Sequence, residues 1–353
     1  MVPMTFHSMP EASTTTRRDV LRLGSLGIAG LVATRLTHPA LAQTADRIDI
    51  HHHWHPPAIT DSFQGASIGD SWIGGAWTPE KALTLMDRFN IQTGILSVRN
   101  PRERVSSDLC RRVNESAAHL VQMYPTRFGA FAMVPQFDVD AAAEEAIYAL
   151  DALHLDGVLL NPSVDNRYLG AGEFEPLMSE LNQRDTVVLI HPTSPFYFNE
   201  LSLGYQSSVM EYVFDTTRAI ANLITTGSIE RNPNIRFITA HAGGAAPYIA
   251  SRLAEQAVRH DPKILELAPQ GVLHYMKTLY YGTGQATSPY ALAALLNLVD
   301  SRQVVFGTDL PISPPSLITQ SDGVLQGYTD LSNEDIQRIE RDNALRLFPR
   351  LGG

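Results

Sequence analysis

The chain has 353 residues, of which 44% are hydrophobic and 18% are charged, so it can bury a sizeable core and is not intrinsically disordered. Its net charge of −10 argues against nucleic acid and anionic membrane surfaces as partners. The single cysteine, Cys110, excludes an internal disulfide and any cysteine-rich metal or iron–sulfur site. A bound metal would therefore take histidine and carboxylate ligands, which favours zinc or a similar divalent ion.

Residues 1–42 have the pattern of a twin-arginine signal peptide. The pair Arg17-Arg18 precedes an apolar stretch over 23–33, and an Ala-Leu-Ala sequence at 40–42 suits signal peptidase. The alternative is an amphipathic N-terminal helix. The apolar stretch is short for a bilayer span, and no later segment qualifies as one. We expect a protein exported to the periplasm, with no membrane span in the mature chain.

From residue 43 onwards, short apolar runs alternate with helical patterns. Eight runs read as buried strands, over 48–53, 91–98, 128–134, 157–160, 186–190, 235–240, 278–282 and 303–308. Helical patterns separate them, over 78–89, 106–124, 138–153, 174–183, 209–226, 245–259 and 290–299. This alternation predicts an α/β fold with a parallel sheet, and eight units predict a closed (β/α)8 barrel, or TIM barrel, as one domain over 43–353.

Two further stretches complete the predicted layout. Residues 54–77 are rich in Gly, Ser, Pro and Trp, and we expect a long loop over the barrel mouth. Residues 333–348 read as a charged amphipathic helix that packs on the outside. The first helix of the alternation is expected to begin with Thr78 as its N-cap and Pro79 at its first position.

Histidine and aspartate occupy the carboxyl ends of several expected strands. His51 and His53 end the first strand and share one face, because side chains alternate, whereas His52 faces away. The fifth, sixth and eighth strands end on His191, His241 and Asp309. A single histidine of this kind would more simply be a packed core imidazole. Five such groups at strand ends that converge on one face favour a metal site.

The donor set has a definite chemistry. Three neutral imidazoles and one carboxylate can hold a divalent cation while leaving a position open for water or substrate, as catalytic zinc sites do. The remaining histidine, His241, can then act as a base or hold the substrate.

Four segments resemble the amidohydrolase superfamily, and more narrowly its aminocarboxymuconate-semialdehyde decarboxylase-like branch. They are Ile48-Asp49-Ile50-His51-His52-His53, Leu189-Ile190-His191-Pro192-Thr193, Thr239-Ala240-His241-Ala242-Gly243-Gly244 and Gly307-Thr308-Asp309-Leu310-Pro311. The resemblance covers about 47–348. Residues 157–161 and 214–219 look closer still to the 6-methylsalicylate decarboxylase-like members.

The resemblance implies one Zn²⁺ per chain, alternatively Mn²⁺, held by His51, His53, His191 and Asp309, without an organic cofactor. His241 and Asp309 would be the catalytic residues. The fourth strand is followed by Asn161, where hydrolytic relatives often carry a carboxylated lysine, which argues against a two-metal site. The implied reaction is non-oxidative release of CO₂ from an aromatic or unsaturated carboxylate such as a hydroxybenzoate. Relatives of this kind are commonly homodimers.

Four residues are weaker candidates for binding the substrate. Arg99 ends the second strand and could hold a carboxylate in two-pronged fashion, or form a surface salt bridge. Phe196 and Tyr197 could wall an aromatic substrate or simply pack. Trp54 is expected to border the pocket. In addition, Asp215 could hydrogen-bond a metal-ligand histidine or cap the helix that follows it.

Two alternative functions stay open at this point. A lactonase- or amidase-type hydrolase could use the same metal site, and no motif in the sequence separates it from a decarboxylase. A periplasmic metal- or ligand-binding protein that kept the barrel is disfavoured, because the full ligand set and His241 are present.

Overall fold

The computed structural model describes residues 46–62, 76–99, 104–201 and 203–352. The signal peptide expected over 1–42 lies outside the described residues, as does much of the loop expected over 54–77. The described start of that loop contains a short helix, α2 (Pro57–Ser62), which its mixed composition does not predict. Within the described ranges, no helix is both long and apolar enough to cross a membrane.

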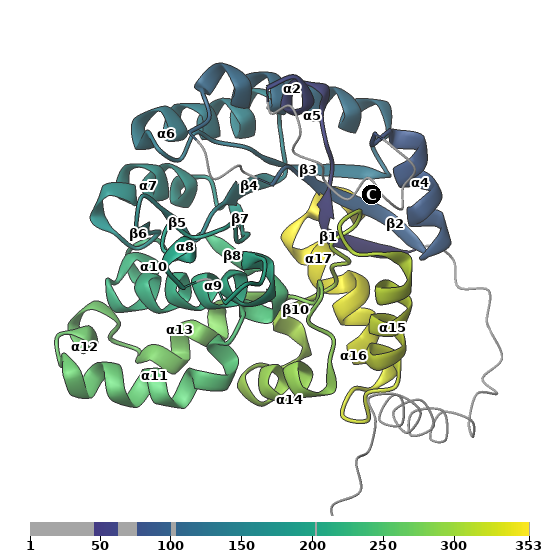
Figure 1. The fold of residues 1–353 in the computed structure, drawn as a ribbon. Helices are drawn as coiled ribbons and strands as arrows, with labels where there is room; N and C mark the ends of the chain where they lie inside the picture. Colours follow the sequence, from purple (N-terminus) through teal and green to yellow (C-terminus); the bar gives the residue numbers. More distant parts are fainter. Residues whose placement is uncertain (1–45, 63–75, 100–103, 202, 353) are drawn as a thin grey trace, which may run out of the picture. The chain divides into compact units, whose positions relative to one another are not determined.

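Eight parallel strands form one sheet, each paired with the next strand of the alternation (Figure 1). They are β1 (Arg47–His53), β2 (Ile91–Ser97), β3 (Phe128–Ala132), β4 (Gly157–Leu160), β7 (Val187–Ile190), β8 (Arg236–Thr239), β9 (Tyr280–Gly282) and β10 (Val304–Val305). Backbone bonds then join the first strand to the segment after the last. Ile50 N–H donates to Phe306 O at 3.1 Å, and Asp309 N–H donates to His51 O at 2.8 Å. The predicted (β/α)8 barrel is confirmed.

Helices flank the strands as the alternation predicts. The main ones are α4 (Pro79–Arg88), α5 (Ser107–Met123), α6 (Val139–Ile147), α7 (Glu175–Gln183), α9 (Ser207–Thr225), α11 (Ala246–His260) and α14 (Pro289–Leu298). Thr78 caps α4, accepting a hydrogen bond from Lys81 N–H at 3.3 Å, and Pro79 is the first helical residue, as predicted.

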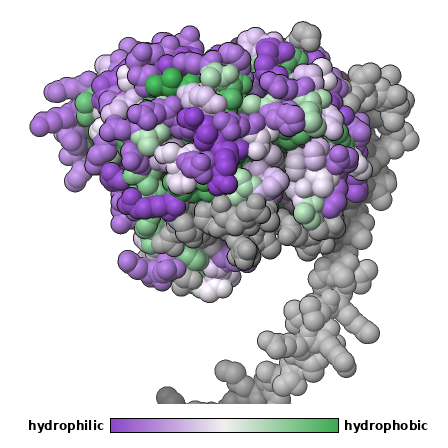
Figure 2. All heavy atoms as spheres, turned by 90° about the horizontal axis from the view of Figure 1, so that it is seen from above, coloured by the Kyte–Doolittle hydropathy of each residue, from purple (hydrophilic) through white to green (hydrophobic). Residues whose placement is uncertain are grey.

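Seen from above Figure 1, over α5 and α6, hydrophilic side chains predominate and hydrophobic ones are scattered (Figure 2).

Several shorter elements have no clear periodic signal in the sequence. They are the antiparallel hairpin of β5 (Ser163–Val164) and β6 (Arg167–Tyr168), and the helices α8 (Phe198–Leu201), α10 (Ser228–Arg231), α12 (Ile264–Leu267), α13 (Val272–Thr278) and α15 (Pro315–Gln326). Most contain too few residues for a helical or strand period to repeat.

The C-terminal helix differs from the prediction in shape. It consists of α16 (Asn333–Gln337) and α17 (Asn343–Leu347), joined by one wide helical turn over 338–342. Phe348, directly after α17, packs edge-on against Phe131 of β3, with ring centroids 5.9 Å apart. Leu347 and Phe348 are buried in the same apolar cluster as the strand residues Ile48 and Ile95. The stretch alternates exposed and buried residues, as expected of an amphipathic helix, and its last turn also buries apolar side chains against those of the strands.

Candidate metal centre and cavity

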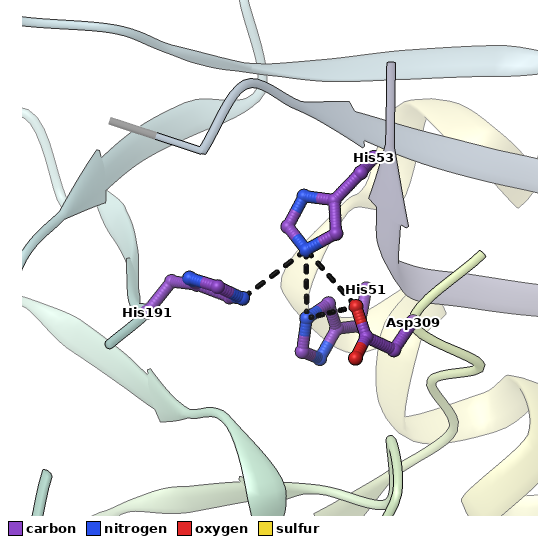
Figure 3. Close-up of side chains that lie close together, drawn as sticks. All are labelled: His51, His53, His191 and Asp309. Atoms are coloured by element: carbon purple, nitrogen blue, oxygen red, sulfur yellow. Dashed lines mark hydrogen bonds and ion pairs between the residues drawn. The ribbon is translucent and has the colours of Figure 1, made fainter. Parts of the chain in front are cut away.

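Four predicted ligands lie together at the carboxyl ends of β1, β7 and β10 (Figure 3). His53 Nε2 is 3.2 Å from His51 Nε2 and 3.1 Å from His191 Nε2. Asp309 Oδ1 is 3.1 Å from His53 Nε2 and 3.4 Å from His51 Nε2. One ligand atom from each of the four residues lies within 4.8 Å of all the others. The convergence predicted from strand ends is present.

These distances fit a shared cation. Donors about 2.0–2.2 Å from one metal ion lie about 3–3.5 Å apart when they are neighbours in its coordination shell, close to the four separations of 3.1 to 3.4 Å given above. All four side chains are buried, and Asp309 Oδ1 accepts no hydrogen bond. Buried imidazole nitrogens that face one another and an unsatisfied carboxylate oxygen need a positive group between them.

The protonation preferences of the ligands also suit a cation. Burial lowers the pKa of His51 well below its usual range, although the Asp309 carboxylate opposes this. Burial and the neighbouring His53 likewise lower the pKa of His191. For Asp309, burial would raise the pKa, but His51 and His53 together bring it below the usual range. The lowered pKa values of His51, His191 and Asp309 favour their deprotonated forms, which are the forms that bind a metal ion.

A β-bulge in β1 turns the side chains of His51 and His53 toward the expected metal site. Asp49 pairs with Gly94 of β2 and His52 pairs with Leu96, so β1 has one extra residue over this interval. Ile48 and Ile50 lie in the apolar cluster with other strand residues, whereas His51 and His53 both reach the ligand cluster. Strict alternation would put Ile50 and His51 on opposite faces; a bulge re-aims side chains in this way.

Asp49 connects the bulge in β1 to Thr308, in the segment after β10, through hydrogen bonds. This role is not predicted from the sequence. Its carboxylate is fully buried and accepts hydrogen bonds from His51 N–H at 3.0 Å, Thr308 N–H at 3.0 Å and the Thr308 hydroxyl at 2.5 Å. His52 Nδ1 lies 3.1 Å from the same carboxylate, so His52 faces away from the ligands, as predicted. A charged residue inside an apolar run is the sequence signal that could have identified Asp49.

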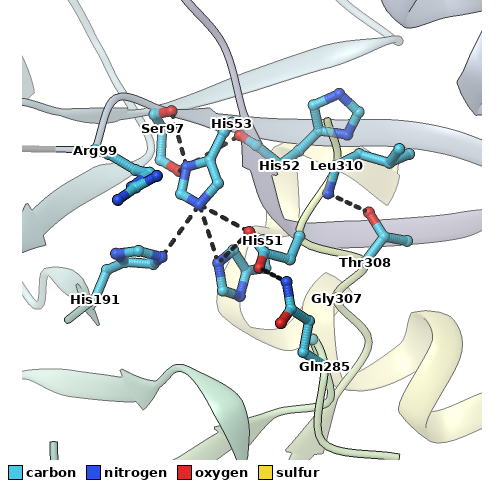
Figure 4. A network of polar contacts seen from close by, with 12 residues as sticks. His51, His52, His53, Ser97, Arg99, His191, Gln285, Gly307, Thr308 and Leu310 are labelled. Carbon is cyan, nitrogen blue, oxygen red and sulfur yellow. Dashed lines mark hydrogen bonds and ion pairs between the residues drawn. The ribbon is translucent and has the colours of Figure 1, made fainter. Parts of the chain in front are cut away.

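Ser97, the last residue of β2, orients His53 (Figure 4). His53 Nδ1 lies 3.3 Å from Ser97 O and 3.0 Å from Ser97 Oγ. With the proton on Nδ1 donated to this carbonyl, Nε2 keeps its lone pair for a cation.

His241 lies next to the four ligands but outside their group. Its ring centroid is 5.1 Å from that of His51 and 5.8 Å from that of His191. Its Nδ1 lies 2.8 Å from Gly284 O, which can only accept, so Nδ1 carries a proton. In the neutral ring, Nε2 is then the nitrogen that can accept a proton.

A cavity of about 750 Å³ opens over this centre. Its described lining includes His191, His241 and Asp309 together with Arg99, Phe198, Gln206, Ser207, Ser208, Val209, Tyr212, Val213, Gln285 and Ile312. Arg99 is half-buried and donates to the Tyr212 hydroxyl at 2.8 Å. Arg99 therefore occupies the cavity, with a hydroxyl rather than a carboxylate as its partner.

Three other predicted residues lie elsewhere. Trp54 is buried in the core, with its ring 5.8 Å from that of Trp77, and borders a different cavity. Phe196 packs edge-on against Phe137, and the Tyr197 hydroxyl contacts Arg218. None of the three belongs to the described lining of the cavity over the ligands, where Phe198 and Tyr212 supply the aromatic rings instead.

Asp215 neither contacts a ligand nor caps a helix. It lies in the middle of α9 and accepts hydrogen bonds from the Ser163 hydroxyl at 3.0 Å and the Tyr168 hydroxyl at 2.9 Å. Burial raises the pKa of Asp215, although these hydrogen bonds oppose the rise. Both expectations for Asp215 are wrong, because the hairpin of β5 and β6 supplies its partners and carries no periodic signal in the sequence.

Comparison with known proteins agrees with this architecture. Residues 48–350 match the Amidohydrolase family model. A decarboxylase, yanB, of Aspergillus niger is 36% identical, covering 86% of this chain and 88% of the relative. The 6-methylsalicylic acid decarboxylase of Penicillium expansum is 33% identical over 87% of this chain and 97% of its own.

A solved structure shares the fold. The 5-carboxyvanillate decarboxylase of Novosphingobium aromaticivorans, in complex with manganese and 4-hydroxy-3-methoxy-5-nitrobenzoic acid, superposes with a TM-score of 0.76. The match covers 87% of this chain and 99% of that one at 20% identity. The family match and the two curated relatives confirm the resemblance read from the strand-end motifs, and the chain belongs to the amidohydrolase family.

Proposed function

We propose that the chain is a metal-dependent decarboxylase that releases CO₂ from a hydroxylated aromatic carboxylate such as a hydroxybenzoate. The observation that carries the proposal is the buried cluster of three histidines and one aspartate beneath a cavity of about 750 Å³, with His241 beside it. The 33% and 36% identical relatives are both named decarboxylases, which supports this reaction over hydrolysis.

His51, His53, His191 and Asp309 would hold a single Zn²⁺ or Mn²⁺. When bound, such an ion polarises substrate oxygens and stabilises the negative charge that develops in the transition state. The manganese in the 5-carboxyvanillate decarboxylase makes Mn²⁺ as strong a candidate as Zn²⁺. Elemental analysis of the purified protein distinguishes the two metals, with one equivalent of either ion per chain expected.

The reaction replaces a carbon–carbon bond by a carbon–hydrogen bond. A ring carbon takes up a proton, the bond to the carboxyl group breaks, and its electron pair returns to the ring as CO₂ leaves. His241 and Asp309 both border the cavity and are the groups that would hold or deliver the proton. Arg99 would pair with the anionic substrate from the end of β2.

The first test is a CO₂-release assay with a panel of hydroxybenzoates that includes 6-methylsalicylate, run beside ester and lactone hydrolysis. We expect CO₂ release by the metal-loaded protein and a loss of about 10²-fold or more in kcat for His241→Ala, as for removal of a positioned acid–base group. Hydrolysis without CO₂ would assign the chain to the hydrolases instead.

Arg99→Ala tests the substrate anchor separately. A hydrogen bond to a charged group is worth about 1.5–3 kcal/mol, so we expect kcat/KM to fall about 10- to 100-fold, mainly through a higher KM. Tyr212→Phe removes the hydroxyl that receives the Arg99 hydrogen bond and should have a smaller effect. The exposed Arg112, paired with Asp108 on α5, is the matched control. An unchanged KM in Arg99→Ala would remove Arg99 from the substrate site.

We also propose export to the periplasm, on the basis of the Arg17-Arg18 pair and the apolar stretch after it. The proposal predicts that a fusion of residues 1–42 to a reporter is exported. Replacing both arginines by lysine should abolish export, and a reporter exported regardless would contradict the twin-arginine route.

A homodimer is proposed as well. It is supported by apolar side chains at and before α9, where Leu203, Tyr205 and Val209 are 72%, 59% and 60% exposed. Light scattering should give twice the chain mass, and Leu203→Glu should lower it. A wild-type mass equal to one chain would contradict the proposal.

A further inference from the structure

The loop after β9 lies against His51, His241 and Asp309, which are two of the four expected metal ligands and the histidine beside them. No sequence motif marks this loop. Gly284 O accepts the hydrogen bond from His241 Nδ1 at 2.8 Å. A Cβ at Gly284 would lie 2.8 Å from His51 Nδ1, closer than real Cβ atoms approach other groups, so only glycine fits beside the His51 ring. The next residue, Gln285, donates a hydrogen bond from its Nε2 to Asp309 Oδ2 (Figure 4).

The two oxygens of Asp309 have different surroundings. Oδ1 lies within 3.1 to 3.4 Å of His53 and His51 and accepts no hydrogen bond. Oδ2 accepts the hydrogen bond from Gln285. A carboxylate with two free oxygens can bind a cation through both, whereas this amide occupies one of them.

The Gln285 backbone is held in an unusual conformation at the same point. Its φ is 53°, a left-handed value that costs a residue with a side chain about 1 kcal/mol or more. Asp309 also has a left-handed φ, of 60°. Residues other than glycine keep a left-handed backbone only where surrounding contacts hold it. We therefore expect the fold to fix the backbone of both Gln285 and Asp309 at the cavity wall.

We propose that Gln285 is a positioning residue that makes Asp309 bind the metal through Oδ1 alone. The inference rests on the proposed metal centre and goes beyond it, because it assigns the coordination mode of the carboxylate to a cavity-lining glutamine. With one carboxylate oxygen and three imidazoles as ligands, a metal ion that takes a fifth ligand would have that position available for substrate or water. Gln285 acts through Asp309 and needs no contact with the substrate.

Gln285→Met tests the proposal, since methionine keeps the length of the side chain and removes the donor. The readouts are the affinity for Mn²⁺, from competition with a chelator, and the visible absorption spectrum of the Co²⁺-substituted protein. We expect an affinity about 10- to 100-fold lower, as for other residues that orient metal ligands, and an altered Co²⁺ spectrum. Gln285→Ala should match Gln285→Met, because both lose the same hydrogen bond.

Gln206→Met is the matched control, because Gln206 borders the same cavity on another element. Its metal affinity and Co²⁺ spectrum should equal those of the wild type. Wild-type affinity and spectrum in Gln285→Met would overturn the positioning role, and a wild-type protein that binds no metal would overturn both proposals. Metal binding with the expected Gln285 effect but no CO₂ release would contradict the proposed reaction alone and leave the positioning role supported.

Discussion

His53→Ala is expected to abolish metal binding and to lower kcat/KM about 10³-fold or more. His53 is the member of the ligand group whose Nε2 is close to all three others, at 3.2 Å from His51, 3.1 Å from His191 and 3.1 Å from Asp309. Loss of a metal ion forfeits several kcal/mol of charge stabilisation in the transition state, and each 1.4 kcal/mol or so corresponds to a factor of ten in rate.

Elemental analysis and the CO₂-release assay measure the two parts of this prediction. His119→Ala makes the same substitution on the exposed side of α5, away from the ligands, and should keep both metal and activity. His53→Ala that retained one equivalent of metal and substantial activity would show that the cluster is not the catalytic metal centre.

Much of the fold could be predicted because the signals involved are local. Apolar runs of strand length alternate with amphipathic stretches, and side-chain caps such as Thr78 mark where helices begin. The hairpin of β5 and β6, and the packing position of the last turn of α17, could not be predicted in the same way. Their positions depend on tertiary partners, Asp215 for the hairpin and Phe131 for Phe348 after α17.

The same distinction between local signals and tertiary partners applies to the candidate site. The cluster of His51, His53, His191 and Asp309 could be predicted because a barrel brings the carboxyl ends of its strands together, so residue type at a strand end is enough. Gln285 and Tyr212 come from a loop and a helix, where one polar residue among many carries no signal. The bulge in β1 adds one residue to a strand and changes which side chains face inward, and alternation alone does not show it.

Asp49→Ala is expected to have the largest effect on stability, at about 3–5 kcal/mol, because it leaves buried donors without an acceptor. Asp49 Oδ1 accepts the hydrogen bonds from His51 N–H and Thr308 N–H, and Oδ2 accepts the one from the Thr308 hydroxyl. These bonds join β1 to the segment after β10, so they hold two metal-ligand segments in one geometry. In a chain of this size the melting temperature should fall by about 10 °C, and metal affinity should fall about 10- to 100-fold.

Asp49→Asn separates the hydrogen-bond pattern from the charge. An amide oxygen in place of Oδ1 can still accept from both backbone N–H groups, while its NH₂ group faces the Thr308 hydroxyl and His52 Nδ1, both of which can accept a hydrogen bond. We therefore expect Asp49→Asn to recover at least half of the stability lost in Asp49→Ala, measured by thermal unfolding of the metal-free proteins. Equal losses in the two variants would mean that the buried negative charge, rather than the acceptor geometry, joins the strand ends. The metal affinity of Asp49→Asn should then fall as far as that of Asp49→Ala, since His51 would have lost the same support.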